Sequence, residues 1–108
     1  MILYGIPTCD TCKKAERALK SAGHDVTVRD IRADPLTPDD WRELIHEFGD
    51  RLVNRNSPTW RGLSDWMQAS DADAQLAANP TLMKRPVIRD GGRMTLGWDD
   101  DAQAAWGL

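Results

Sequence analysis

Two cysteines, Cys9 and Cys12, are separated by two residues near the start of the chain, and they are its only cysteines. They follow a short apolar segment and open a helix predicted over residues 9–22. A helix start offers unpaired N–H groups and the positive end of the dipole, which stabilise a thiolate, the nucleophile in thiol–disulfide exchange. A spacing of three residues puts both sulfurs on one side of the helix. The pair therefore predicts redox chemistry in which Cys9 attacks first and Cys12 resolves the mixed disulfide.

Two other interpretations of the cysteine pair remain open from the residues alone. Both thiols could be buried and inert. A zinc site would need two more ligands, and although His24 follows Cys12 at nearly the spacing of a zinc finger, no second histidine follows it closely. His46 falls inside a predicted amphipathic helix as an ordinary surface residue. The sequence favours redox chemistry over either interpretation and predicts no bound metal.

A strand–helix–strand unit is predicted to position the cysteines. Residues 2–5 form a short apolar segment typical of a buried strand, and Pro7 ends it. Apolar residues then recur every three or four positions through the helix. Val26 and Val28 alternate with polar residues, as in a half-buried strand. A crossover helix of this length implies parallel strands and a right-handed connection.

The rest of the chain is predicted as a helical insertion, about residues 36–80, followed by a hairpin and a last short helix that runs through Trp106. Within the insertion one helix is expected over residues 59–67 and another over 71–78. Strands near 86–89 and 93–97 flank a glycine turn. The prediction is an α/β fold with a four-stranded mixed sheet, in a single domain over residues 1–108. The five tryptophans are expected to pack in the core or at its border.

Composition and charge restrict the possible functions. A chain of 108 residues suits one domain, and a net charge of −3 with scattered arginines is unfavourable for nucleic acid or an anionic membrane. No apolar run approaches the roughly 20 residues that span a bilayer. The first nine residues carry no charged side chain and lack the basic segment of a signal peptide, so we expect a cytoplasmic protein. In a reducing compartment two cysteines do not suggest a structural disulfide.

Three segments resemble the ArsC/Spx family, the arsenate-reductase-like branch of the thioredoxin fold. The first is Tyr4–Ala15 (YGIPTCDTCKKA), which contains both cysteines. The second is Asn79–Ile88 (NPTLMKRPVI), which contains an Arg-Pro pair before a strand. The third is Val53–Arg61 (VNRNSPTWR), in the helical insertion. The resemblance covers nearly the whole chain and implies a thioredoxin-like βαβ…ββα fold.

The resemblance also implies roles for individual residues. Cys9 matches the family's catalytic cysteine, and Arg85 matches an arginine that holds an anion or thiolate beside it. Pro86 matches the cis-proline of thioredoxin-like active sites, and Thr8 belongs to the cysteine loop as a structural residue of the site. Arg55 matches a second anion-binding arginine. Their pattern alone would make Arg85 and Arg55 solvated surface charges; the resemblance favours the site for Arg85 and leaves both interpretations open for Arg55.

The sequence departs from the arsenate reductases after the last strand. Those enzymes carry a further arginine there, whereas this chain reads Leu96-Gly97-Trp98-Asp99 and continues with two more acids. Acidic side chains disfavour an oxyanion, so arsenate is not the expected substrate. The Gly97-Trp98 ending is similar to a branch of thiol reductases and Spx-type regulators.

These features lead to a first hypothesis and alternatives. The first is a glutathione-linked thiol–disulfide oxidoreductase that acts on a small-molecule thiol or disulfide, with no tightly bound cofactor and with glutathione or glutaredoxin as a redox partner. The main alternative is an Spx-type redox-sensing regulator that binds RNA polymerase. A glutaredoxin-type arsenate reductase and a module without turnover are the others.

Overall fold

The computed structural model describes all residues from 1 to 108, which form two units. The first unit contains Met1–Asp34 and Arg85–Leu108. The second contains Pro35–Lys84. Both cysteines belong to the first unit, so this unit is described first.

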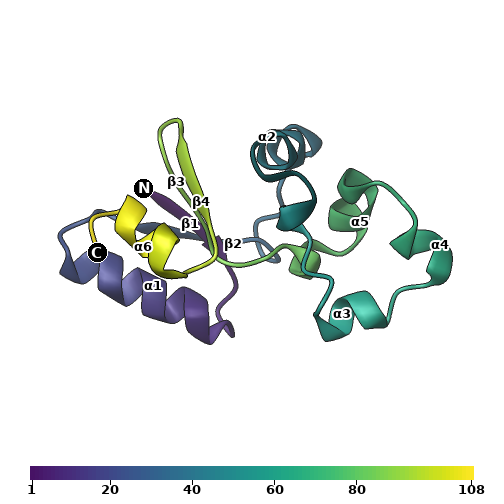
Figure 1. Ribbon diagram of the computed structural model, residues 1–108, viewed down its shortest axis with the longest axis horizontal. Helices are drawn as coiled ribbons and strands as arrows, with labels where there is room; N and C mark the ends of the chain where they lie inside the picture. The colour runs from purple at the N-terminus through teal and green to yellow at the C-terminus, as the bar shows by residue number, and fades with distance from the viewer. The chain divides into compact units, whose positions relative to one another are not determined.

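The first unit is built on a four-stranded sheet with the strand order β2-β1-β3-β4. Its strands are β1 (Ile2–Gly5), β2 (Thr27–Asp30), β3 (Val87–Asp90) and β4 (Arg93–Leu96). Leu3 lies opposite Val28 in the parallel β1–β2 pair and opposite Ile88 in the antiparallel β1–β3 pair (Figure 1). β3 and β4 form an antiparallel hairpin. The sheet confirms the predicted α/β fold and the predicted mixture of parallel and antiparallel strands.

Two helices, α1 (Asp10–Ser21) and α6 (Asp100–Ala105), pack on the same face of this sheet (Figure 1). Their shared core consists of Leu3, Cys12, Ala15, Leu19, Val26, Ile88 and Trp106. The Trp106 indole also donates a hydrogen bond of 2.8 Å to the Thr95 hydroxyl, which ties α6 to β4. Burial of Ala15 and Leu19 fixes α1 on the sheet, and this holds the start of α1 at the carboxyl end of β1.

The second unit is entirely helical apart from an isolated bridge between Val53 and Met83. Its elements are α2 (Pro38–Phe48), η1 (Gly49–Leu52), α3 (Pro58–Arg61), α4 (Asp65–Gln68), α5 (Ala72–Ala78) and η2 (Pro80–Leu82). A capping box between Thr37 and Asp40 starts α2. The helices confirm the expectation of a helical stretch between β2 and β3.

The single helix predicted over residues 59–67 is wrong, because two short helices occupy this stretch (Figure 1). The chain leaves the helical path after Gly62, and the Ser64 hydroxyl caps α4 by accepting the Met67 N–H at 3.3 Å. Gln75 of α5 holds the end of α4. Its buried amide donates to three backbone carbonyl groups at the end of α4 and just beyond it: those of Met67, Gln68 and Ser70.

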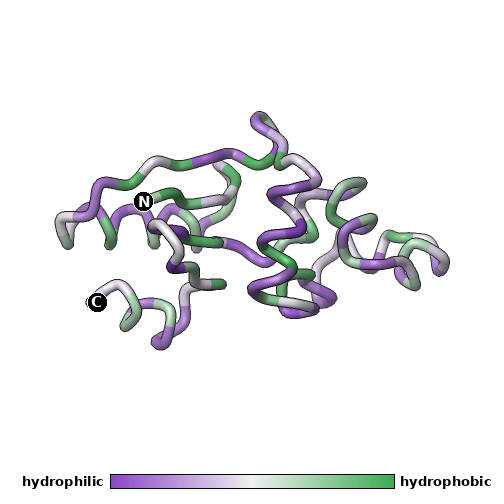
Figure 2. The backbone as a smooth tube through the Cα atoms, turned by 90° about the horizontal axis from the view of Figure 1, so that it is seen from above, coloured by the Kyte–Doolittle hydropathy of each residue, from purple (hydrophilic) through white to green (hydrophobic).

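Two expectations about burial also need correction. Trp41 and Trp106 are buried, but Trp66 is 72% exposed and does not pack in the core. Val26 is buried, whereas Val28 is 42% exposed because β2 is an edge strand with a partner on one side only. Hydrophobic stretches along the chain are short and alternate with hydrophilic ones (Figure 2). None of the helices has the length and apolar character needed to span a membrane.

Candidate active site

Cys9 is the N-cap residue of α1, at the end of the loop that follows β1. Its extended backbone (φ −87°, ψ 110°) turns the chain into the helix. The Cys9 sulfur accepts a hydrogen bond of 3.3 Å from the Cys12 backbone N–H. A Ser, Thr or Asp oxygen usually takes this capping position, and here a sulfur does so. The half-buried Cys9 therefore sits where the unpaired N–H groups of α1 are concentrated, as the sequence predicts.

Cys12 is the third residue of α1 and is only 4% exposed. It belongs to the core between α1 and the sheet. Its sulfur lies against the backbone of β1 at Gly5, so closely that a Cβ atom at Gly5 would come within 2.8 Å of it. The two cysteines, both free thiols, thus have different surroundings. Cys9 is partly exposed to solvent, whereas Cys12 is buried next to it.

The pKa values of the two thiols differ in direction. Burial by itself raises the pKa of Cys9, but hydrogen bonds from the Cys12 side chain and backbone and from Arg85, together with the Arg85 charge, lower the pKa below its ordinary value. For Cys12, burial followed by the hydrogen bond and charge of Cys9 raises the pKa to about 12. The site therefore favours the thiolate of Cys9 over that of Cys12, whose thiol stays protonated near neutral pH.

Arg85 comes from the segment just before β3 and places its side chain beside Cys9, where it donates a hydrogen bond to the sulfur. The Arg85–Pro86 peptide bond is cis, which confirms the prediction made from the family resemblance. Pro86 is buried, and its carbonyl group accepts the Gly97 N–H at 2.8 Å. The first unit thus brings Cys9, Cys12 and Arg85 together from two distant segments.

Thr8 and Arg55 are the two other residues expected in the site. Thr8 lies in the turn before α1, with an exposed side chain. Arg55 belongs to the second unit, where its guanidinium stacks over the Trp60 ring at 5.5 Å. A role for either residue in the site stays a prediction. No group of three or more histidine, cysteine or acidic side chains in the structure could hold a metal ion.

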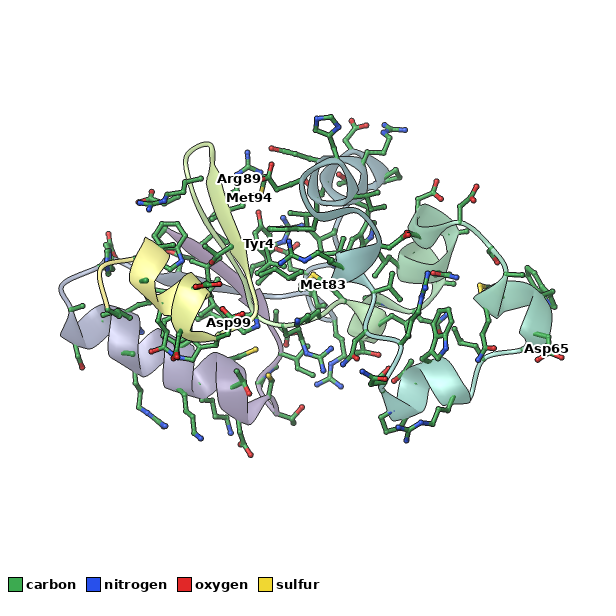
Figure 3. The ribbon with its side chains drawn as sticks, in the orientation of Figure 1. Tyr4, Asp65, Met83, Arg89, Met94 and Asp99 are labelled. Carbon is green, nitrogen blue, oxygen red and sulfur yellow. The ribbon has the colours of Figure 1, made fainter.

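Gly5 and Trp98 are two neighbours that the sequence did not assign to the site. A glycine inside a strand is a known signal of a close approach, and Gly5 carries it. Trp98 is half-buried against the core that contains Cys12, and its carbonyl group accepts a hydrogen bond of 3.0 Å from Gln103. The next residue, Asp99, caps α6 by accepting the Ala102 N–H at 2.9 Å and lies where that helix begins (Figure 3).

The sheet order, the cysteine pair at the start of α1 and the cis-proline before β3 are those of a thioredoxin-like protein. The model of the ArsC family matches residues 4–106, and the chain belongs to this family.

Individual relatives agree with this assignment. A Haemophilus influenzae protein described as uncharacterised is 38% identical over 110 residues, which cover 96% of each chain. The solved structure of a protein named YffB has a TM-score of 0.87 and 36% identity, and the match covers 96% of each chain. The global transcriptional regulator Spx of Staphylococcus haemolyticus is 29% identical over 92% of this chain and 80% of its own.

Proposed function

We propose that the protein is a glutathione-linked thiol–disulfide oxidoreductase in which Cys9 is the nucleophile and Cys12 is the second thiol. The main support is the asymmetry of the two sulfurs. Cys9 is accessible, with a lowered pKa, and Cys12 is 4% exposed, with a pKa of about 12. A reductase of this kind needs one thiolate that meets the substrate and one thiol held in reserve close to it.

The reaction begins when the Cys9 thiolate attacks one sulfur of a substrate disulfide. A Cys9–substrate disulfide forms, and the other half of the substrate leaves as a thiolate that takes up a proton from water. Cys12 then loses its proton and attacks the Cys9 sulfur, so that the first half leaves as a thiol and a Cys9–Cys12 disulfide remains. Two molecules of glutathione return the pair to the dithiol and become glutathione disulfide. Alternatively, one glutathione attacks the mixed disulfide directly.

Arg85 has a role both before the attack by Cys9 and after the mixed disulfide has formed. Its hydrogen bond and charge favour the Cys9 thiolate before the attack. Once Cys9 is in a mixed disulfide, the sulfur carries no charge, and the guanidinium can bind a carboxylate of the substrate with its planar set of donors. Glutathione carries two carboxylates, which makes it a suitable partner for such a site.

An assay of catalytic turnover tests this proposal. The wild type is mixed with a small organic disulfide, glutathione, glutathione reductase and NADPH, and NADPH consumption is followed. We expect turnover above the uncatalysed exchange, loss of that turnover in Cys9→Ser, and partial or full retention in Cys12→Ser when glutathione resolves the intermediate. Equal rates for the wild type and Cys9→Ser would contradict the proposal.

A second candidate function is a redox-sensing regulator that binds RNA polymerase. The similarity to Spx, which extends over 80% of that regulator's chain, supports it. Its test is capture of purified RNA polymerase by the immobilised protein, with the cysteines reduced in one sample and oxidised in another. Redox-dependent capture together with an absence of turnover would favour the regulator over the oxidoreductase.

A further inference from the structure

Gly5 is the last residue of β1, and the space beside it is occupied by the Cys12 sulfur. A Cβ atom built on Gly5 would lie 2.8 Å from that sulfur, 3.2 Å from the Cys12 Cβ and 3.2 Å from the Leu3 Cδ2. The first distance is far below van der Waals contact, so an alanine at this position requires the sulfur to move. Gly62 and Gly92, by contrast, have no neighbour closer than 3.6 Å to such an atom.

The backbone on either side of this contact is held in place. Gly5 pairs with Asp30 in the β1–β2 ladder, and its carbonyl group accepts the Ile31 N–H at 3.0 Å. On the other side, Ala15 and Leu19 anchor α1 in the core with no exposed surface. Neither element can retreat without loss of these contacts. Rotation of the Cys12 side chain relieves the contact with the sulfur at 2.8 Å, and the two contacts at 3.2 Å require only small local shifts, so this rotation is the main response expected to a larger residue at Gly5.

We propose that Gly5 is a positioning residue for the second thiol, because its missing side chain provides the space that holds the Cys12 sulfur beneath Cys9. This inference rests on the proposed function, in which Cys12 resolves the mixed disulfide. Helical geometry leaves few side-chain rotamers for Cys12. A Cys12 sulfur displaced from this space therefore becomes more exposed and loses its hydrogen bond to Cys9.

The perturbation is Gly5→Ala, and alkylation of each thiol in the folded protein is measured across pH, with the modified residue identified by mass spectrometry. We expect alkylation of Cys12 to accelerate about tenfold, the scale on which an overpacked side chain changes a local equilibrium. We also expect the midpoint pH for alkylation of Cys9 to rise, because the Cys12 side-chain hydrogen bond lowers the pKa of Cys9 in the wild type.

Two controls separate positioning from general damage. Gly92→Ala adds the same methyl group in the β3–β4 turn, where no atom lies within 4 Å, and should leave both thiols unchanged. Wild type in enough urea to match the stability of Gly5→Ala shows what destabilisation alone does. That sample should expose both thiols through unfolding without a shift in the midpoint pH of Cys9.

The proposal is overturned if Gly5→Ala folds and leaves Cys12 as protected, and Cys9 as acidic, as in the wild type. If Gly5→Ala does not fold, the double variant Gly5→Ala/Cys12→Ala decides. This variant removes the sulfur and should recover folding, and a double variant no more stable than the single one also overturns the proposal. These readouts need no turnover, so a wild type without exchange activity would contradict the proposed function alone.

Discussion

The variant Cys9→Ser removes the thiol expected to react and leaves Cys12 as the only cysteine. In the wild type the pKa of Cys12 is raised from an ordinary 9.0 to about 12, and burial is the largest cause. Since each pH unit below a pKa lowers the thiolate fraction tenfold, Cys12 should hold about a thousandfold less thiolate than an ordinary cysteine at neutral pH.

The alkylation rate expected for Cys12 in Cys9→Ser follows from the separate causes of its raised pKa. The hydrogen bond and negative charge of Cys9 also raise the pKa of Cys12, and both disappear in this variant. Burial of the Cys12 side chain, 4% exposed, remains. We therefore expect Cys12 in this variant to be alkylated at pH 7.5 more than tenfold, and at most about a thousandfold, more slowly than an ordinary thiol. Cys12→Ser, which keeps Cys9, should instead react faster than an ordinary thiol.

The assay is iodoacetamide alkylation under pseudo-first-order conditions, with the product identified by peptide mass. Each variant is measured folded and again in urea, where the remaining cysteine should react at the rate of an unprotected thiol. This comparison shows that the slow reaction of Cys12 comes from the fold and not from the residue. A folded Cys9→Ser protein that is alkylated as fast as its unfolded form would refute the argument.

Three further predictions concern the same site. Arg85→Gln should raise the pKa of Cys9, because a hydrogen bond and a positive charge beside the sulfur are lost, and slow its alkylation at neutral pH, whereas Arg17→Gln on the exposed side of α1 should leave the profile unchanged. The pKa of Cys12 is higher in the folded state than in the unfolded one, so its stabilising contribution is complete below pH 9.0 and is lost as pH rises toward 12. The difference in unfolding free energy between wild type and Cys12→Ala, measured by urea titration, should therefore fall between pH 9 and 11. With glutathione and glutaredoxin present, the protein should reduce arsenate no faster than a blank, because no arginine stands in Leu96–Asp99; turnover matching that of a dedicated arsenate reductase would contradict this interpretation.

The strands and α1 follow from local patterns in the sequence. Apolar segments bounded by proline and glycine predict β1, β3 and β4 within a residue or two, and the three-to-four spacing predicts α1. The exposure of Val28 could not be predicted in this way, because it depends on which strand lies at the edge of the sheet. The break between α3 and α4 depends on the Ser64 cap and on the Trp60 carbonyl group, which a continuous helix would pair with the Ser64 N–H but which instead accepts the Leu63 N–H and the Gln68 side chain.

The candidate site likewise has features that local sequence patterns predict and features that only long-range packing decides. The spacing of Cys9 and Cys12 and their place at a helix start can be inferred from neighbouring residues. The approach of Arg85 to Cys9 depends on the pairing of β3 with β1, a long-range choice that the family resemblance supplied and the local pattern did not. The contact between Gly5 and Cys12 depends on how closely α1 packs on β1, and a glycine in a strand gives only a general hint of it.

Trapping of the reaction intermediate tests the central claim most directly. Cys12→Ser is incubated with glutathione disulfide at neutral pH, and the protein is analysed by intact mass and by peptide mapping. The account predicts a single glutathione adduct, located on Cys9, while the wild type under the same conditions proceeds to a Cys9–Cys12 disulfide without a lasting adduct. The account would be contradicted if Cys12→Ser formed no adduct while Cys9→Ser became glutathionylated at Cys12.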